Sequence, residues 1–303
     1  MLSKKLMATI LAITIMGVSA MALGCTSPGP MTGASPTAAQ LSGTIKISGS
    51  TTIYPVSQLL ARSFSDKYPG VKVDVQAGGS GKGMTDVGSG LVDIGMASEE
   101  VPADILAKYP DIVTHKIGES AVVVIANSAD DVSSIDAKDL SLLYDNVSEK
   151  PAAFNGYTVY TRAEKSGTAD TFSTYLFNNK SAIYNSAATT GVNGNQAMVD
   201  AVAAKPKSIG FVDFGFAKNA PAVKIIGIRD ENGSYAPPTA ENLIKVFKGT
   251  DKSLYPAGLT RPLNFLTKGQ PTPLVKSFID YAKSPEGKYA FDENGFFSIQ
   301  EIE

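Results

Sequence analysis

Short apolar runs typical of strands alternate with amphipathic runs typical of helices, and this alternation is the feature that most restricts the fold. Three strand–helix pairs carry the pattern most clearly: strand 44–48 with a helix from Pro55, strand 71–75 with a helix to about Gly90, and strand 159–161 with helix 168–177. Strands and helices that alternate in this way build α/β domains. The sequence therefore predicts the α/β class.

Further segments have the residue spacing of either a strand or a helix. Strands are predicted at 91–96, 121–126, 209–212 and 223–228, and helices at 136–144, 196–204, 241–247, 274–282 and from Ser284-Pro285-Glu286 onward. The run at 121–126 is apolar throughout, which is typical of a strand that is buried on both faces. These elements extend the α/β pattern along the rest of the chain.

The first 24 residues have the pattern of a secretory signal peptide. Lys4 and Lys5 precede an apolar run over 6–18, and small residues follow. Cys25, the one cysteine of the chain, comes directly after Leu-Gly, which resembles the lipobox of lipoproteins, although Ala22 stands where that pattern usually has Leu. A single cysteine cannot form a disulfide within the chain. We therefore expect export and lipid attachment at Cys25.

Residues 25–42 have the composition of a flexible linker. Three prolines lie among Ser, Thr, Gly and Ala, with too few apolar residues to bury a core. Beyond the signal, no stretch is apolar for long enough to span a bilayer. We expect a soluble body that is anchored to the membrane through Cys25, at the cell surface or in the periplasm.

The charge of the chain is nearly balanced, with 27 Lys and Arg against 29 Asp and Glu and a net charge of −2. This balance does not indicate a nucleic-acid partner. An anionic ligand would have to be held by local hydrogen-bond donors, because bulk attraction would not hold it.

The stretch "AGGSGKGMTDVGSG" over 77–90 has the small residues of a phosphate-binding loop but not the spacing of a nucleotide motif. A nucleotide-triphosphate loop needs Gly five residues before the second glycine and Ser or Thr after the lysine. Here Gln76 and Gly83 occupy those positions. A strand, a glycine turn and a helix N-terminus remain, and these can hold a free anion through backbone N–H groups or can form a turn without a ligand.

Small polar residues recur at three strand-to-helix junctions, namely 48–52, 78–81 and 162–168. In open α/β sheets, ligands bind outside the carboxyl ends of the strands. Each junction offers hydroxyls and free N–H groups at the start of a helix, and Arg162 adds a planar charged fork suited to phosphate. Three such turns in one exported chain indicate a site for a small oxyanion.

Five segments resemble the substrate-binding proteins of phosphate ABC transporters. They are "ISGSTTIYPV", "VQAGGSGKGM", "VDIGMAS", "TRAEKSGTADTF" and "YPAGLTRPLNFLTKGQPTPLVKSFIDYAKSPEGKYAF". The first four are short, and their order makes them specific, whereas the last is long and distinctive. Together they span most of 45–298.

The resemblance implies a type II periplasmic-binding-protein fold, in which a strand hinge joins two α/β lobes and one anion closes between them. Residues 43–125 and 255–303 would form lobe 1, and residues 126–254, inserted within it, would form lobe 2. The implied partners are inorganic phosphate and the permease subunits of an ABC importer. The protein would act as a monomer, without a cofactor.

The phosphate-binding residues are carried over position by position from the family. The resemblance implies Ser50 and Thr51 in the first turn, Ser80 in the second, and Arg162, Ser166, Gly167 and Thr168 in the other lobe. Thr52 is interpreted as a helix cap and Lys82 as a solvated lysine, and neither is placed in the site.

The family often has a carboxylate shortly after "VDIG", where it accepts the proton of hydrogen phosphate. Here Ser98 occupies that position and Glu99 follows it, so we expect one of the two to contact the ligand. The alternative is a binding protein for sulfate, molybdate or tungstate. Phosphate carries a proton to donate at neutral pH and sulfate does not, so a site with donors alone would favour sulfate.

The sequence does not indicate an enzyme. His115, the one histidine, is interpreted as a solvated side chain, and the nucleophile-elbow motif G-x-S-x-G is absent from the sequence. No cluster has the spacing of a zinc or calcium site. We therefore expect neither catalytic residues nor a metal.

Overall fold

The computed structural model describes residues 41–145, 149–185 and 187–303. The predicted signal peptide and Cys25 lie outside the described residues. Within the described ranges, no helix combines the length and apolarity needed to cross a membrane.

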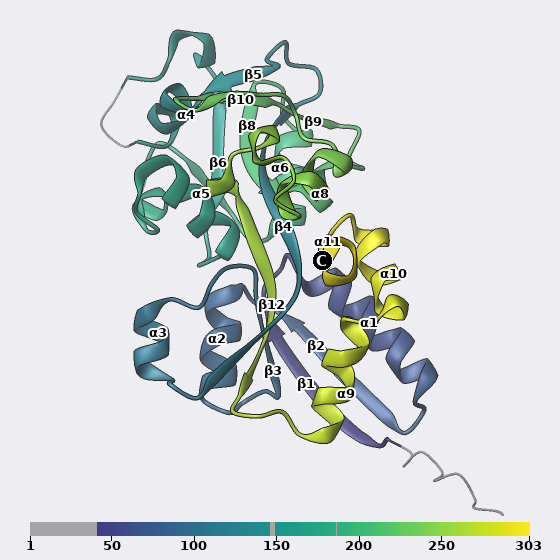
Figure 1. Ribbon diagram of the computed structural model, residues 1–303. Coiled ribbons are helices and arrows are strands. Elements are labelled where there is room, and N and C mark those ends of the chain that lie inside the picture. Colours follow the sequence, from purple (N-terminus) through teal and green to yellow (C-terminus); the bar gives the residue numbers. More distant parts are fainter. Residues whose placement is uncertain (1–40, 146–148, 186) are drawn as a thin grey trace, which may run out of the picture. The chain divides into compact units, whose positions relative to one another are not determined.

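A mixed ten-stranded sheet forms the framework of residues 43–298 (Figure 1). Its main path has the order β2-β1-β3-β12-β4-β8-β6-β7, and β9 and β13 pair with β4 beside this path. The strands are β1 (Gly43–Gly49), β2 (Val71–Ala77), β3 (Ile94–Ala97), β4 (Ile112–Asn127), β6 (Thr158–Arg162), β7 (Thr190–Val192), β8 (Ser208–Asp213), β9 (Val223–Ile225), β12 (Thr260–Lys268) and β13 (Phe297–Ser298). A separate three-stranded sheet has the order β11-β10-β5, with β5 (Ser134–Asp136), β10 (Gly227–Asp230) and β11 (Gly233–Tyr235).

Two long antiparallel strands, β4 and β12, connect the two halves of the structure. Figure 1 shows them side by side between the group of β1 to β3 and the group of β6 and β8. The first part of β4 pairs with β12, and its last residues pair with β8 and β9. The apolar run predicted at 121–126 is therefore the C-terminal part of β4, a strand that serves both halves.

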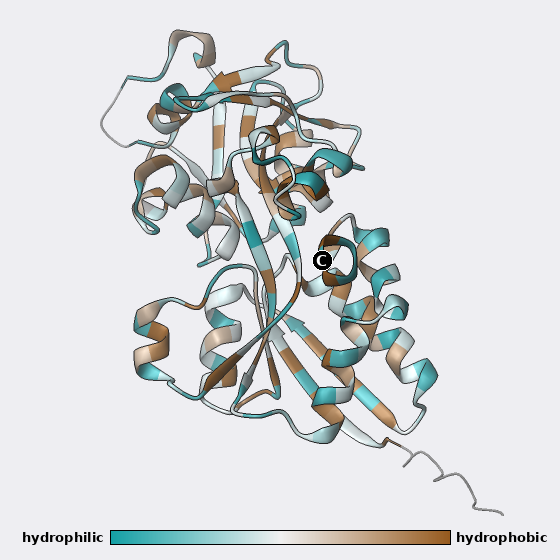
Figure 2. Cartoon of the chain, viewed as in Figure 1, coloured by the Kyte–Doolittle hydropathy of each residue, from teal (hydrophilic) through white to brown (hydrophobic). Residues whose placement is uncertain are grey.

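The first half packs helices around the parallel strands β1 to β3. These helices are α1 (Tyr54–Lys67), α2 (Ser80–Gly88), α3 (Ala103–Lys108), α9 (Pro273–Ala282) and α10 (Pro285–Asn294). Phe64 of α1 meets Phe278 of α9 edge to face, with ring centroids 5.2 Å apart. Figure 2 shows hydrophobic residues along the strands and hydrophilic residues on the outer surfaces of α1 and α10. Burial of these apolar faces against the sheet stabilises this half.

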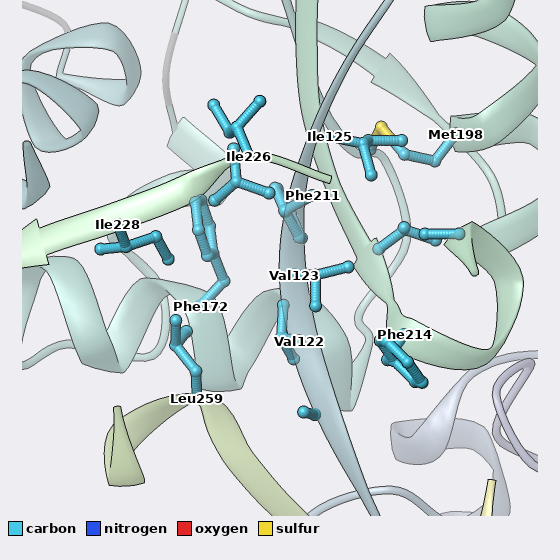
Figure 3. Close-up of a cluster of buried hydrophobic side chains, with 14 of the residues drawn as sticks. Val122, Val123, Ile125, Phe172, Met198, Phe211, Phe214, Ile226, Ile228 and Leu259 are labelled. Carbon is cyan, nitrogen blue, oxygen red and sulfur yellow. The ribbon is translucent and has the colours of Figure 1, made fainter. Parts of the chain in front are cut away.

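The second half has its own apolar core, part of which Figure 3 shows. Its helices are α4 (Ala137–Tyr144), α5 (Gly167–Phe177), α6 (Asn195–Ala203), α7 (Phe214–Ala217), α8 (Ala240–Phe247) and α11 (Ile299–Ile302), with short 3-10 helices η1 (Ala152–Phe154), η2 (Ala182–Asn185), η3 (Lys252–Leu254) and η4 (Ala257–Leu259). Phe172 of α5 stacks on Phe211 of β8 with ring centroids 4.2 Å apart, and Val123 and Ile125 of β4 lie in the same cluster. Phe297 near the C-terminus also packs here.

The predicted α/β class is confirmed, but several strands differ from the prediction. The short strands β5, β7, β11 and β13 were not predicted, and β4 begins at Ile112, before the predicted run at 121–126. The predicted strand 91–96 begins only at Ile94, and Leu91 is 67% exposed in a turn. The predicted strand 223–228 is two strands, β9 and β10, which belong to different sheets. The sequence interpretation missed β12, because buried polar residues interrupt its apolar alternation. The lobe boundaries at 125/126 and 254/255 stay a prediction.

We expect Phe211→Ala to lower the free energy of unfolding by about 3–5 kcal/mol, because it would leave a cavity beside Phe172. Tyr289→Ala is the matched control, since Tyr289 is 57% exposed, and it should cost about 0.5 kcal/mol or less. Urea denaturation would measure both. Equal losses in the two variants would contradict this description of the second core.

Candidate functional site

The hydroxyl groups of the three predicted turns meet at one place. Ser50 Oγ donates to Ser98 Oγ at 3.0 Å, and Ser80 Oγ lies 3.3 Å from Ser98 Oγ. Thr52 Oγ1 lies 3.3 Å from Oγ1 of Thr168, which belongs to helix α5 in the other half of the structure. All five side chains are buried. We call these five residues the hydroxyl cluster. Ser80, Ser98 and Thr168 come together as expected, and Thr52 joins them.

Two helices begin at this cluster. Ser80 is the first residue of α2, and Ser166 is the N-cap of α5, where its side chain accepts from the Thr168 N–H at 3.2 Å. A helix N-terminus offers unpaired N–H groups and the positive end of the helix dipole. The junctions therefore supply both backbone and hydroxyl donors.

Two glycines allow the turns to approach each other. A Cβ at Gly79, where φ is +87°, would lie 2.4 Å from the Lys165 carbonyl oxygen. A Cβ at Gly167 would lie 2.7 Å from the Ser98 carbonyl oxygen and 2.9 Å from Ser80 Oγ. Real Cβ contacts are longer, so glycine is required at both positions for the two sides to touch. Gly167 thus lies in the predicted site as a residue of close approach.

Arg162, at the end of β6, is buried and held on three sides. Its Nε donates to Glu164 Oε1 at 2.9 Å, its NH1 to Asn195 Oδ1 at 3.2 Å and its NH2 to Thr51 Oγ1 at 3.0 Å. The NH2 group also bonds to Glu164 Oε1, and the Gly194 N–H donates to the same oxygen at 3.1 Å. These contacts use four of the five N–H donors of the guanidinium. Arg162 and Thr51 are therefore neighbours, as the sequence interpretation requires.

A second buried arginine, Arg261 of β12, contacts the cluster and was missed from the sequence. Its NH1 group donates to the carbonyl oxygen and to Oγ of Ser98, each at 3.1 Å. Its NH2 group donates to Thr52 Oγ1 at 3.0 Å and to Asp213 Oδ2 at 2.7 Å. Burial raises the pKa of Asp213, while the charge of Arg261 opposes that shift. A guanidinium stays protonated in proteins, so the two side chains form a buried ion pair.

The interpretation of Thr52 as a helix cap is wrong. Ile53 is the N-cap of α1 and makes no side-chain cap bond, while Thr52 Oγ1 accepts from Arg261 and, at 2.9 Å, from Asn195 Nδ2. Ser50 Oγ instead accepts from the backbone N–H groups of Thr52 and Ile53, at 3.2 and 3.4 Å. The side chain of Ser50 therefore holds the first turn together.

Two more residues that bond to these arginines and hydroxyls were missed in the sequence analysis, although both lie at strand–helix junctions. Asn195 is the first residue of α6, and Asp213 is the last residue of β8. Both therefore lie at junctions between strands and helices, where the sequence analysis looked for ligand groups. Neither junction carries the run of glycine and serine that marked the three recognised turns.

Glu99 is 7% exposed and faces the other half of the chain. Its carboxylate bonds to Lys180 Nζ at 3.4 Å, and its backbone oxygen accepts from Asn264 Nδ2 at 3.0 Å. Burial, followed by the charge of Asp170, raises the pKa of Glu99 to about 7, and Lys180 opposes the shift. Asp170 accepts from the Tyr184 hydroxyl at 2.8 Å, and its own pKa is also raised by burial. The Glu99 side chain thus bonds to Lys180, and Glu99 directly follows Ser98 of the hydroxyl cluster in the sequence.

Two residues that the sequence analysis left outside the site have local partners. Lys82, exposed on α2, pairs with Asp86 one helical turn on. His115 of β4 is hydrogen-bonded through Nε2 to Thr267 Oγ1 at 2.9 Å. Burial lowers the pKa of His115, so its ring is neutral near pH 7. His115 is part-buried and bonded to Thr267, so it is less exposed to solvent than the sequence interpretation expected.

The comparisons with known proteins agree with this architecture. The family model described as "PBP superfamily domain" matches residues 34–286. The chain belongs to the PBP superfamily. A curated relative in Bacillus subtilis (strain 168), "Phosphate-binding protein PstS", is 26% identical over 274 residues, which cover 86% of this chain and 82% of that protein.

Solved structures share the fold. A putative phosphate ABC transporter substrate-binding protein with bound phosphate, from Clostridium perfringens, has a TM-score of 0.70 and 22% identity, covering 85% of this chain and all of that one. The OxyR regulatory domain of Pseudomonas aeruginosa has a TM-score of 0.52 and 12% identity, covering 80% of this chain and 98% of that one. The predicted two-lobed fold is confirmed. Because a regulatory domain also has it, the fold alone does not give the function.

We expect Gly167→Ala to lower the free energy of unfolding by about 1–3 kcal/mol, because the added methyl group would press on Ser98 and Ser80. Gly81→Ala is the matched control, since a Cβ there would meet Lys165 at an ordinary 3.7 Å. Alanine within α2 should leave the stability unchanged or raise it by up to about 1 kcal/mol. Urea denaturation would measure the free energy of unfolding of both variants. A loss of stability in Gly81→Ala as large as that in Gly167→Ala would contradict the close approach at Gly167.

The raised pKa of Glu99 makes stability depend on pH. Between its ordinary pKa of 4.5 and about 7, the folded protein holds a proton that the unfolded chain has released. Stability should therefore fall as the pH rises through this window, and should level off above it. Glu99→Gln should remove this contribution, so its melting temperature relative to wild type should be higher at about pH 8 than at about pH 5. Parallel melting curves across pH would refute the assignment.

Proposed function

We propose that the protein binds inorganic phosphate outside the cytoplasm and delivers it to the permease of an ABC importer. The observation that carries the proposal is the buried guanidinium of Arg162 beside a cluster of hydroxyls at two helix N-termini. Such a set offers hydrogen-bond donors from several directions to one small oxyanion. The names of the relatives, which include phosphate-binding proteins, support the same ligand.

The proposed phosphate-binding residues come from both lobes. They are Ser50, Thr51, Ser80, Ser98, Glu99, Arg162, Ser166, Gly167 and Thr168. Arg162 would supply the charge, Ser80 and Thr168 would supply hydroxyl donors, and the start of α5 would supply N–H groups. Ser50 would act by holding the first turn. Because these residues belong to two lobes joined by β4 and β12, binding would draw the lobes together as a hinge.

The proposed activity is binding without chemical change. The curated relatives are named as binding proteins, and the hydroxyls of the cluster are occupied by hydrogen bonds to one another and to Arg261. Such an arrangement suits the holding of an anion, because the donors are already oriented before the ligand arrives.

A second oxyanion is the alternative, and one observation favours it. Ser98 presents a hydroxyl where the family often has a carboxylate, and Glu99 bonds to Lys180. A site without a proton acceptor would bind sulfate, molybdate or tungstate as well as phosphate. If Glu99 turned toward the ligand on closure, it would restore the preference for a protonated anion.

We also propose that the body is exported and tethered to the membrane by lipid on Cys25, with residues 25–42 as the tether. The signal-like pattern of 1–24 and the lipobox-like segment before Cys25 support this. We propose that it works as a monomer beside its permease.

Calorimetric titration should show one phosphate bound per chain with a dissociation constant of about 1 μM or lower, which corresponds to about −8 kcal/mol. The protein should first be partly unfolded and dialysed, so that bound ligand is removed. Arg162→Ala should weaken binding by about 2–5 kcal/mol, because the buried anion would lose its main countercharge. Arg229→Ala is the matched control, since Arg229 forms an exposed pair with Asp136, and it should bind like wild type.

Sulfate and molybdate titrated in parallel separate the proposal from its alternative. Phosphate should bind more tightly than either anion. Tighter binding of sulfate or molybdate would establish the alternative, and wild-type affinity in Arg162→Ala would overturn the placement of the site.

A further inference from the structure

Arg261 begins two chains of hydrogen bonds that end on hydroxyls of the proposed site. It lies on β12, which Figure 1 shows between the groups that carry β3 and β8. Its NH1 group donates to Ser98 Oγ and its NH2 group to Thr52 Oγ1. The bond to Asp213 fixes the orientation of the guanidinium. One guanidinium thus donates to two hydroxyls, each through a different terminal nitrogen.

The first chain runs through Ser98 to Ser80. A hydroxyl has one proton to donate and two lone pairs that accept. Ser98 Oγ accepts from Arg261 and, at 3.0 Å, from Ser50 Oγ, which uses both lone pairs. Its proton is therefore directed to Ser80 Oγ at 3.3 Å. Ser80 Oγ also accepts from the Ser98 N–H at 3.2 Å, so its own proton remains for an outside acceptor.

The second chain runs through Thr52 to Thr168. Thr52 Oγ1 accepts from Arg261 and, at 2.9 Å, from Asn195 Nδ2, which again uses both lone pairs. Its proton is therefore directed to Thr168 Oγ1 at 3.3 Å. Because Thr168 accepts this bond, its proton too remains for an outside acceptor.

We infer that Arg261 is a positioning residue that fixes Ser80 and Thr168 as donors to the bound anion. The inference rests on the proposed phosphate site, of which Ser80 and Thr168 are members. Hydrogen bonds in a chain polarise one another, and a bond from a cation is stronger than one from a neutral group. Arg261 therefore acts on the anion through the two hydroxyls, while Arg162 acts from the other side.

Double-mutant cycles with inorganic phosphate as the ligand test the first chain. Arg261→Lys keeps a positive charge beside Asp213, but an ammonium lacks the two arms of a guanidinium. Ser80→Ala should weaken phosphate binding about tenfold in the wild-type protein. In the Arg261→Lys background the same change should cost about threefold or less, because the Ser80 hydroxyl is then free to turn.

Thr51→Val provides the matched control for this cycle. The Thr51 hydroxyl accepts from Arg162 and belongs to neither chain. Its loss should therefore weaken binding by the same factor in the wild-type and Arg261→Lys backgrounds. A general loosening of the site would instead reduce the effect of Thr51→Val and of Ser80→Ala alike.

Ser98→Ala gives a second cycle that leaves the Arg261–Asp213 pair in place. In this background the effect of Ser80→Ala should shrink, while the effect of Thr168→Val should stay the same, since Thr168 ends the other chain. If Arg261→Lys fails to fold in thermal unfolding, this cycle decides alone. Additive effects in the cycles of the folded variants would overturn the inference. A wild-type protein that binds no phosphate would instead overturn the proposed function.

Discussion

The burial of two guanidinium groups is the constraint on which the site depends. Arg162 and Arg261 are both buried, and removal of each charge from water costs several kcal/mol unless the protein replaces the lost hydrogen bonds. Glu164 and Asp213 supply one carboxylate each. Most of the other N–H groups go to neutral oxygens of residues near strand ends, although Arg261 Nε has no hydrogen-bond partner among the described residues. The need to satisfy two buried cations thus draws the hydroxyls into one place.

Asn195 connects the two arginines. Its Oδ1 accepts from Arg162 and its Nδ2 donates to Thr52, which in turn accepts from Arg261. An amide can do this because it carries an acceptor and a donor on one rigid plane. The two charges are therefore held in a single network that includes residues from both halves of the chain, and each half lacks part of the partners that its arginine needs. Contact between the halves and formation of the site are thus the same event.

Much of the fold and part of the site could be predicted from the sequence, for local reasons. Ser80, Ser166 and Arg162 stand in turns whose composition marks them, and α1, α5 and α9 have clear helical spacing. Arg261 gave no such signal, because it lies inside a strand whose polar residues are buried. A buried arginine is explained only by partners such as Asp213 and Ser98, which lie far away in the sequence. Pattern rules act over a few residues, so they do not reach such partners.

The glycines show a similar limit. The glycine-rich turn suggested backbone N–H groups that surround a ligand, and the positive φ of Gly79 fits a tight turn. Yet the shortest distances at Gly79 and Gly167 run to the opposite turn, to the Lys165 and Ser98 carbonyl oxygens. These two residues are small so that two chain segments can touch. A sequence shows that a residue is small, but the partner that requires it to be small becomes visible only in three dimensions.

Position 98 shows how one substitution can change the character of an anion site. A carboxylate there would accept a proton from the ligand and would repel an anion that has none to give. Ser98 instead has both lone pairs filled, by Ser50 and Arg261, so it can only donate. Arg261 occupies one of these lone pairs, so the Ser98 hydroxyl cannot accept a hydrogen bond from the ligand. Without such a neighbour, a serine hydroxyl could either donate or accept. In the proposed site, the anion preference would therefore depend on the direction of the hydrogen bonds, which Arg261 on β12 determines.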